Sequence, residues 1–279
     1  MLLMITCTRA PAIDLGWLLH KNPDRPQTID LSFGKAHVVF PEAENSRCTA
    51  ALLLEMDPIE LVRGKVGQEG GPLEHYVNDR PYCVSSFMST ALARAFGTAL
   101  SGRCMRRPDL VDERLPLEFR LEPIAVRGGY SLLETLFSPL GYQVEAVSHP
   151  VDEADPSWGD SQFMTVTLRG EHRLQDALSH LFVLIPVLDD NKHHYVGEDE
   201  ISKLMRHGEG WLDQHPARAL IVRRYLGNHR SLIRAAMDVL VQAAQDLPED
   251  TEGDVREAAI EAALTAAVDA APRVRLQDI

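Results

Sequence analysis

The densest group of side chains capable of chemistry follows the longest apolar block of the chain, around residues 181–188. Carboxylate, amine, imidazole and phenol groups succeed one another there, at Asp189, Asp190, Lys192, His193, His194 and Tyr195. Imidazoles and carboxylates are metal ligands, but ligands on one helix stand three or four residues apart, and adjacent histidines rarely hold one ion. The segment is therefore interpreted as a polar loop or as a loop that contacts a partner, with a metal site as the least favoured alternative.

A second unusual cluster combines an amide, a carboxylate, a guanidinium and two phenols within seven residues. Its candidate binding residues are Tyr76, Asn78, Asp79, Arg80 and Tyr82. Tyr and Arg are enriched among the residues that dominate binding energy at protein interfaces. The alternative is structural, because Asn and Asp side chains also hydrogen-bond the backbone of a turn, here before Pro81. Both interpretations stay open from the residues alone.

A basic run lies on two consecutive predicted helices near the C-terminal third of the chain, with guanidiniums at Arg218, Arg223, Arg224, Arg230 and Arg234. If these helices pack as a hairpin, several guanidiniums would share one face and bind phosphate or an acidic protein surface. Arg103, Arg106 and Arg107 would extend this patch only if the fold brings them near. The alternative is an ordinary solvated charged face.

The common catalytic and cofactor motifs are missing from the sequence. It contains no Gly-rich turn directly after a predicted strand, no P-loop lysine motif, no Gly-x-Ser-x-Gly elbow and no His-Glu-x-x-His pair. Its four cysteines, Cys7, Cys48, Cys83 and Cys104, are widely spaced, whereas metal sites and disulfide frameworks use tighter spacing. We therefore expect reduced core thiols and no catalytic, cofactor-binding or metal-binding residues.

Composition restricts the class of protein further. The 279 residues are 45% apolar and 25% charged, as in soluble globular proteins, and the formal net charge is −13. Such a chain does not attract nucleic acid through its overall field, although a local basic patch still would. No stretch of about 20 apolar residues is present to span a bilayer. The apolar N-terminus lacks a basic leader, so we interpret it as a strand and expect a cytoplasmic protein.

Hydrophobic periodicity predicts an α+β fold, with antiparallel sheets backed by helices in the first two thirds and an all-helical C-terminal third. Alternating or apolar runs predict strands at 2–8, 28–32, 35–40, 49–55, 115–126, 142–147 and 163–169. Helical spacing predicts helices at 13–20, 85–101, 131–139, 174–188, 198–207, 210–214, 217–226 and 230–245. We expect three parts: an α+β lobe over 1–113, a second α+β lobe ending in helices over 114–245, and an acidic linker and helix over 246–279.

Six ungapped stretches resemble one protein family. They are Asp14–Pro23 (DLGWLLHKNP), Asp30–Val38 (DLSFGKAHV), Tyr76–Tyr82 (YVNDRPY), Phe96–Gly102 (FGTALSG), Leu178–Lys192 (LSHLFVLIPVLDDNK) and Tyr195–Glu200 (YVGEDE). In this order they are similar to the N-terminal half of the bacterial HEN-type RNA 3′-terminal ribose 2′-O-methyltransferase. The resemblance spans most of residues 1–235.

The resemblance implies a module that activates an RNA ligase. In that family, this half associates with the C-terminal ligase region of Pnkp, the bacterial polynucleotide kinase–phosphatase–ligase. The pair repairs ribotoxin-cleaved RNA, and the ligase needs the module to become adenylylated. We therefore expect a hetero-oligomer with the Pnkp ligase region, with RNA as a second candidate partner.

The resemblance also implies where this chain differs from a full-length family member. Such members carry an S-adenosylmethionine-dependent methyltransferase further along, with a Gly-rich cofactor motif and a Glu/His metal cluster, and this sequence stops at Ile279 before either. We expect the activator half without catalytic activity, and bonds made or broken only in the partner. The alternative is an RNA-binding module that presents broken ends through the patch between Arg218 and Arg234.

Overall fold

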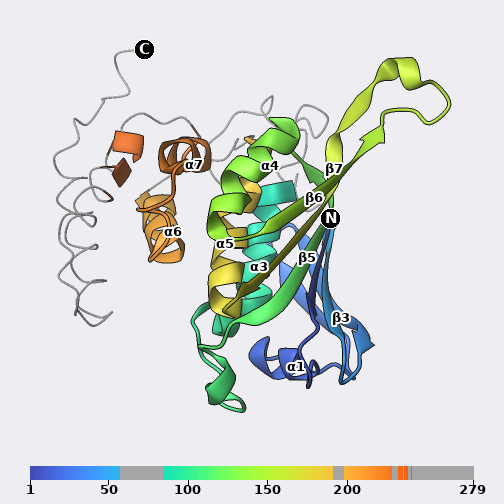
Figure 1. Ribbon diagram of the computed structural model, residues 1–279, viewed down its shortest axis with the longest axis vertical. Coiled ribbons are helices and arrows are strands. Elements are labelled where there is room, and N and C mark those ends of the chain that lie inside the picture. Colours follow the sequence, from blue (N-terminus) through green and yellow to red (C-terminus); the bar gives the residue numbers. More distant parts are fainter. Residues whose placement is uncertain (57–83, 191–197, 228–231, 235, 238–239, 241–279) are drawn as a thin grey trace. The chain divides into compact units, whose positions relative to one another are not determined.

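The computed structural model describes residues 1–56, 84–190, 198–227, 232–234, 236–237 and 240 (Figure 1). The chain forms two compact units, Met1–Asp189 and Asp190–Ile279. Within the described residues, every helix is too short or too polar to cross a bilayer.

The first unit is built on one antiparallel sheet of seven strands in the order β2-β3-β4-β1-β5-β7-β6 (Figure 1). Its strands are β1 (Leu2–Cys7), β2 (Gln27–Leu31), β3 (Gly34–Ala43), β4 (Cys48–Met56), β5 (Leu115–Ala125), β6 (Gln143–Pro150) and β7 (Asp160–His172). The first strand of the chain therefore lies in the middle of the sheet, between β4 and β5.

Three helices cover one face of this sheet, namely α3 (Val84–Leu100), α4 (Gly129–Phe137) and α5 (Leu174–Asp189) (Figure 1). Buried and more exposed side chains alternate along β5: Leu117, Phe119 and Leu121 are buried, and the residues between them are not. This alternation explains why the helices pack on one face of the sheet. Fully burying one such side chain contributes roughly 1.5–3 kcal/mol, so a strand with one apolar face must be covered on that face. The core lies between the sheet and these helices.

The predicted antiparallel sheet backed by helices is confirmed, and most predicted elements of the first unit lie within a few residues of the observed ones. The strands predicted at 28–32 and 35–40 pair as β2 and β3 of a hairpin, and its turn contains Gly34 at φ +145°, a region that favours glycine. The strands predicted at 142–147 and 163–169 are longer than expected and continue to Pro150 and from Asp160.

The predicted division at residues 113 and 114 differs from the structure. Because β1 pairs with β4 on one side and β5 on the other, a single sheet runs through that boundary. The two units instead divide between Asp189 and Asp190. The predicted acidic linker and helix at 246–279 lie outside the described residues.

The second unit contains α6 (Glu198–Gly208) and α7 (Arg218–Tyr225), followed by further helical residues between 232 and 240. The helix predicted at 210–214 is a series of turns, and Gly210, at φ +77°, lies at its start. These described residues are helices and turns, and the rest of the predicted all-helical third lies outside them.

A glycine on β7 makes room for a buried histidine. The imidazole of His172 lies over Gly170, where an added Cβ would stand 2.5 Å from His172 Nε2 and 3.1 Å from the Gly141 carbonyl oxygen. His172 also packs on Tyr142, with ring centroids 4.1 Å apart, and Tyr142 shares a hydrogen bond of 3.0 Å with His180. Burial, helped by nearby Arg114, lowers the pKa of His172 to about 4, so this ring is neutral near pH 7.

We predict that Gly170→Ala destabilises the first unit by about 1–3 kcal/mol, since the new methyl group overlaps the His172 ring in a packed interior. In a His172→Ala background the same change is expected to cost less, because the overlapping ring is gone. These changes form a double-mutant cycle of four proteins: the unchanged chain, the two single variants and the double variant. Chemical denaturation of the four gives the interaction free energy between positions 170 and 172.

Gly97→Ala is the matched control for that cycle. Gly97 is exposed in α3, and nothing lies within 4 Å of its added Cβ, so alanine should raise stability by up to about 1 kcal/mol. Equal effects of Gly170→Ala in the two backgrounds would contradict the steric account of the His172 cluster.

Candidate functional site

The face of the sheet opposite the helices carries one transverse row of polar residues. Strand register aligns Glu42, Thr49, Thr6, Glu118, Arg169 and Gln143 across six neighbouring strands. In the middle of the row, the hydroxyls of Thr6 and Thr49 form a buried hydrogen bond of 2.9 Å. Small Thr side chains leave room there for longer side chains to reach across the two central strands.

Two guanidiniums connect the carboxylates of this face into an alternating chain of charges, which we call the ion ladder: Glu42, Arg47, Glu118, Arg169 and Glu145. Arg47, in the turn before β4, reaches Glu42 at 3.0 Å and Glu118 at 3.4 Å. Arg169 reaches Glu118 and Glu145, each at 2.6 Å. The ladder therefore links β3, β5, β6 and β7 on a face that the described helices do not cover.

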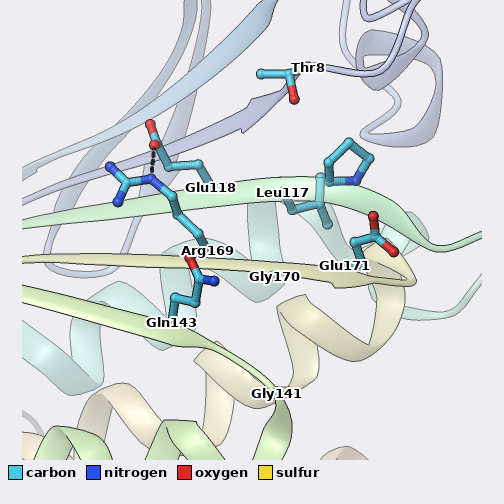
Figure 2. Close-up of a pocket in the computed structure, with 9 residues that line it drawn as sticks. Thr8, Leu117, Glu118, Gly141, Gln143, Arg169, Gly170 and Glu171 are labelled. Carbon is cyan, nitrogen blue, oxygen red and sulfur yellow. Dashed lines mark hydrogen bonds and ion pairs between the residues drawn. The ribbon is translucent and has the colours of Figure 1, made fainter.

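The ladder borders an open cavity of about 510 Å³. Figure 2 shows Thr8, Gln143 and Glu171 around it, with the hydrogen bond from Arg169 to Glu118 beside them. Both oxygens of Glu118 accept hydrogen bonds from guanidiniums, which leaves that carboxylate poorly suited to act as a general base. The cavity is better suited to receive a polar side chain of a partner than to perform acid–base chemistry.

Electrostatics keeps the ladder ionised. Hydrogen bonds from Arg169 hold the pKa of Glu145 below its ordinary value. Glu145 and Glu118 in turn raise the pKa of Arg169. Among the residues that the structure describes, no group of three or more His, Cys, Asp or Glu side chains is arranged to hold a metal ion.

A projecting hairpin extends this face beyond the end of β5. The last pair between β5 and β7 is Ala125 with Phe163, whereas β6 and β7 continue as a hairpin to Pro150 and Asp160. We call residues 149–161 the arm; it stands away from the rest of the sheet at the upper right of Figure 1. It also contains a short 3-10 turn, η4 (Pro156–Trp158).

The arm is both apolar and acidic. Trp158 is 67% exposed and Val151 53% exposed, although large apolar side chains normally lose such exposure on folding. Four exposed carboxylates accompany them, and the arm contains no Lys or Arg, its acids being Asp152, Glu153, Asp155 and Asp160. Hydrogen bonds from Ser157 lower the pKa of Asp155, so its charge persists in mildly acidic solution. Sequence periodicity gave no indication of the arm, because residues 148–162 lack alternation.

The two acids of the first predicted cluster have different surroundings. Asp189 is only 4% exposed; it accepts a hydrogen bond of 2.9 Å from the Ser85 hydroxyl and lies 3.7 Å from Arg127 Nε. This geometry gives Asp189 an internal role at the end of α5. Asp190 belongs to the second unit, where its carboxylate lies 3.5 Å from Arg224 Nε. Partner contact at either position stays a prediction.

The other members of both predicted clusters lie outside the described residues, so contact with a partner there stays a prediction. They are Lys192, His193, His194 and Tyr195, and Tyr76, Asn78, Asp79, Arg80 and Tyr82.

The predicted basic run is divided by its local contacts. Arg218 donates a hydrogen bond of 2.7 Å to the Asp213 carbonyl, and Arg224 lies against Asp190, whereas Arg223 and Arg234 are exposed. Arg230 lies outside the described residues. Binding of phosphate or an acidic surface by this run stays a prediction.

Comparison with known proteins gives one family and two similar structures. Residues 1–241 match the family model described as the RNA repair, ligase-Pnkp-associating, region of Hen1. A solved structure of the Pnkp1/Rnl/Hen1 RNA repair complex contains a chain that is 14% identical with a TM-score of 0.53; the match covers 88% of this chain and 57% of that one. A structure of the Pnkp1/Rnl/Hen1 complex gives 14% identity and a TM-score of 0.49, covering 88% and 56%. No curated protein matches the chain.

At 14% identity, the first of these structures shows a shared fold and no more. The present chain also spans only 57% of the length of that solved chain, so the activity and partners of the longer protein are not transferred by the likeness.

We predict that Arg169→Gln weakens the sheet by about 1 kcal/mol, because it leaves Glu118 and Glu145 without their shared cation on a half-exposed face. It should also raise the pKa of Glu145 to its ordinary value, since Arg169 is the cause of the lowering. A carboxylate with a lowered folded pKa stabilises the fold above its unfolded pKa, and this contribution disappears as the pH falls. The carbon-13 shift of the Glu145 carboxyl reports the titration.

Arg120→Gln is the matched control, because Arg120 pairs with Glu122 on β5 outside the ladder. It should leave the Glu145 titration unchanged. An unchanged Glu145 pKa in Arg169→Gln would show that the ladder does not set the charge of this face.

Proposed function

The chain belongs to the family of ligase-Pnkp-associating regions of the RNA repair protein Hen1, and from this membership we propose that it is a non-catalytic activator of RNA ligation. It binds the ligase region of Pnkp and promotes adenylylation of that ligase, so that cleaved RNA is resealed. The observation that carries the proposal is the family match over residues 1–241. We assign no bond-making step to this chain; a methyltransferase activity belongs to the longer family proteins.

Activation by docking has a definite energetic requirement. A ligase that is mostly in an inactive conformation becomes mostly active only if the module binds the active conformation more tightly, by about 5.5 kcal/mol for a shift from 1:99 to 99:1. A specific interface of more than about 1,000 Å² is large enough to provide such a difference. The module therefore needs a broad, preformed surface with a few strongly anchored side chains.

The arm and the sheet that carries it offer exposed apolar side chains and fixed charges for such a surface. Trp158 and Val151 supply exposed apolar side chains. The ion ladder supplies a fixed charged surface on the same sheet, and its last carboxylate, Glu145, lies on β6, the strand that continues into the arm. An enzyme that seals RNA must attract polyphosphate chains, so basic surface is expected on the ligase. The acidic arm is complementary to such a surface. We therefore propose the arm as the part of this chain that anchors the ligase region.

The activation experiment mixes the purified full chain with the isolated ligase region of Pnkp and radiolabelled ATP. Covalent AMP on the ligase is then measured after gel separation. Activation is expected to increase labelled ligase severalfold over ligase alone, with no label on the present chain. No increase at concentrations where the two proteins co-elute would overturn activation, and no co-elution at all would overturn the partnership.

We predict that Trp158→Ala weakens association with the ligase region at least tenfold, because truncating a hot-spot side chain costs about 2 kcal/mol or more. Adenylylation should then require a correspondingly higher concentration of the module and reach the same maximum. Titration of the labelled product against module concentration separates weaker binding from lost activation.

Trp17→Ala is the matched control, since Trp17 is also exposed but lies on α1 (Asp14–Leu18), away from the arm (Figure 1). It should bind and activate the ligase as the unchanged chain does. Equal loss in both variants, or none in Trp158→Ala, would exclude the arm as the anchor without excluding activation itself.

A further inference from the structure

A second exposed tryptophan lies far from the arm, in a preformed hollow at the other end of the sheet. Trp17, on α1, is 49% exposed and Ile13 beside it 41%. Together with the turn that follows the helix, they line a cavity of about 600 Å³, whose wall also includes Lys21, Asn22, Pro23, Gln27 and Arg106. A hollow of this volume is in the range that proteins use to bind small molecules or single residues of a polymer.

The turn is held in one conformation before any ligand arrives. Lys21 N–H donates to the Gly16 carbonyl at 2.9 Å, and Asn22 Oδ1 accepts from the Asp24 amide at 3.0 Å. Pro23 packs so closely on Gly16 that an added Cβ there would stand 2.9 Å from its ring. Glycine at position 16 is thus required to let the turn fold back on the helix.

The connector between α3 and β5 is fastened onto α1 and brings a cation over the indole. Arg107 pairs with Asp14, and the His20 ring hydrogen-bonds the Arg103 carbonyl at 2.7 Å. These contacts fix the residues between them, so that the Arg106 guanidinium lies 5.6 Å from the centre of the Trp17 ring. A cation over an indole is attracted to its face and remains there without a carboxylate.

This corner carries a small excess of positive charge, whereas the whole chain is acidic. The helix, the turn and the connector together carry six cations, Lys21, Arg25, Arg103, Arg106, Arg107 and Arg114, against five carboxylates, Asp14, Asp24, Asp109, Asp112 and Glu113. Two of these carboxylates, Asp14 and Asp109, are paired with Arg107. Within the part of the chain that the structure describes, no hydrogen bond or ion pair holds the side chains of Lys21 and Arg106. Burial lowers the pKa of Lys21, which indicates that part of its hydration has been removed without a compensating carboxylate.

We propose that the Trp17 hollow binds an unpaired base of single-stranded nucleic acid, stacked on the indole, with the adjacent phosphates on Arg106 and Lys21. One half-exposed aromatic face and cations on its rim are the two elements of sequence-tolerant single-strand binding. Asn22 and Gln27 supply amide groups on the wall of the hollow to meet a base edge. The choice of RNA as the strand rests on the proposed function, whereas the stacking site rests on these residues alone.

A protein partner is the less favoured occupant of this hollow. Protein hot spots bury several apolar side chains in a water-free centre, but only Ile13, Trp17 and Pro23 are apolar among the nine residues of this wall. The wall has two cations, Lys21 and Arg106, against one carboxylate, Asp24, and this excess matches the regular phosphates of a nucleic acid strand better than a single acidic side chain. The site lies wholly in the first unit and does not depend on the basic run of α7.

The test measures RNA binding by the full chain alone, without the ligase. A fluorescein-labelled single-stranded RNA of about ten nucleotides is titrated with protein at several salt concentrations, and anisotropy gives the affinity. Trp17→Ala should weaken binding at least tenfold, as expected for loss of one stacked base. Trp17→Phe, which keeps an aromatic face, should recover most of it. Arg106→Ala should weaken binding and reduce the dependence of affinity on salt by about one phosphate contact.

Two controls make the outcome decisive. Trp158→Ala should leave RNA binding unchanged, and the same RNA annealed to its complement should bind at least tenfold more weakly, because a paired base cannot stack on the indole. The proposal is overturned if the unchanged chain does not bind the single strand, if the duplex binds equally, or if Trp17→Ala and Arg106→Ala bind as well as the unchanged chain. Loss of ligase adenylylation in Trp17→Ala with intact RNA binding would assign the hollow to the protein partner instead.

Discussion

The structure depends on the pairing of β1 with two strands that are far apart in the sequence. Leu2–Cys7 forms its ladder with β4 on one side and β5 on the other, so six residues at the start of the chain join the two halves of a seven-stranded sheet. This central position explains why Leu3 and Ile5 are fully buried. It also fixes α1, which follows β1, and the strands beyond β5, which carry the ion ladder and the arm.

Periodicity was sufficient to predict the elements that have one apolar face. The alternation of Leu117, Phe119 and Leu121 and the helical stripe of α5 each result from burial of one side, and burial leaves a pattern in the local sequence. The order of strands left no such pattern. An apolar first strand is equally compatible with a position at the edge of a sheet or at its centre. For that reason, the predicted boundary between residues 113 and 114 divided what is one sheet.

The candidate surfaces were harder to predict because their residues are distant in sequence. Arg47 and Glu118 are 71 positions apart, and only the registers of β4, β1 and β5 bring them to one face. Trp17 belongs to a stretch that carried the family resemblance, yet nothing in that stretch indicates that Arg106 lies over its ring. Exposure of Trp158 likewise follows from how far β6 and β7 extend, which depends on where β5 ends.

The net charge of −13 conceals two surfaces of opposite sign. Their separation follows from β5 alone: Cys7, at the end of β1 before α1, pairs with Leu117, whereas the arm begins beyond Ala125. Eight residues of strand span about 26 Å at 3.3 Å per residue. This exceeds twice the screening length of about 10 Å at 0.1 M salt, so the acidic arm barely affects the potential at the Trp17 hollow. The same rigid sheet can therefore present an acidic anchor to a basic protein at one end and a basic hollow to a phosphate chain at the other. The electrostatic potential of each surface is then almost independent of the other.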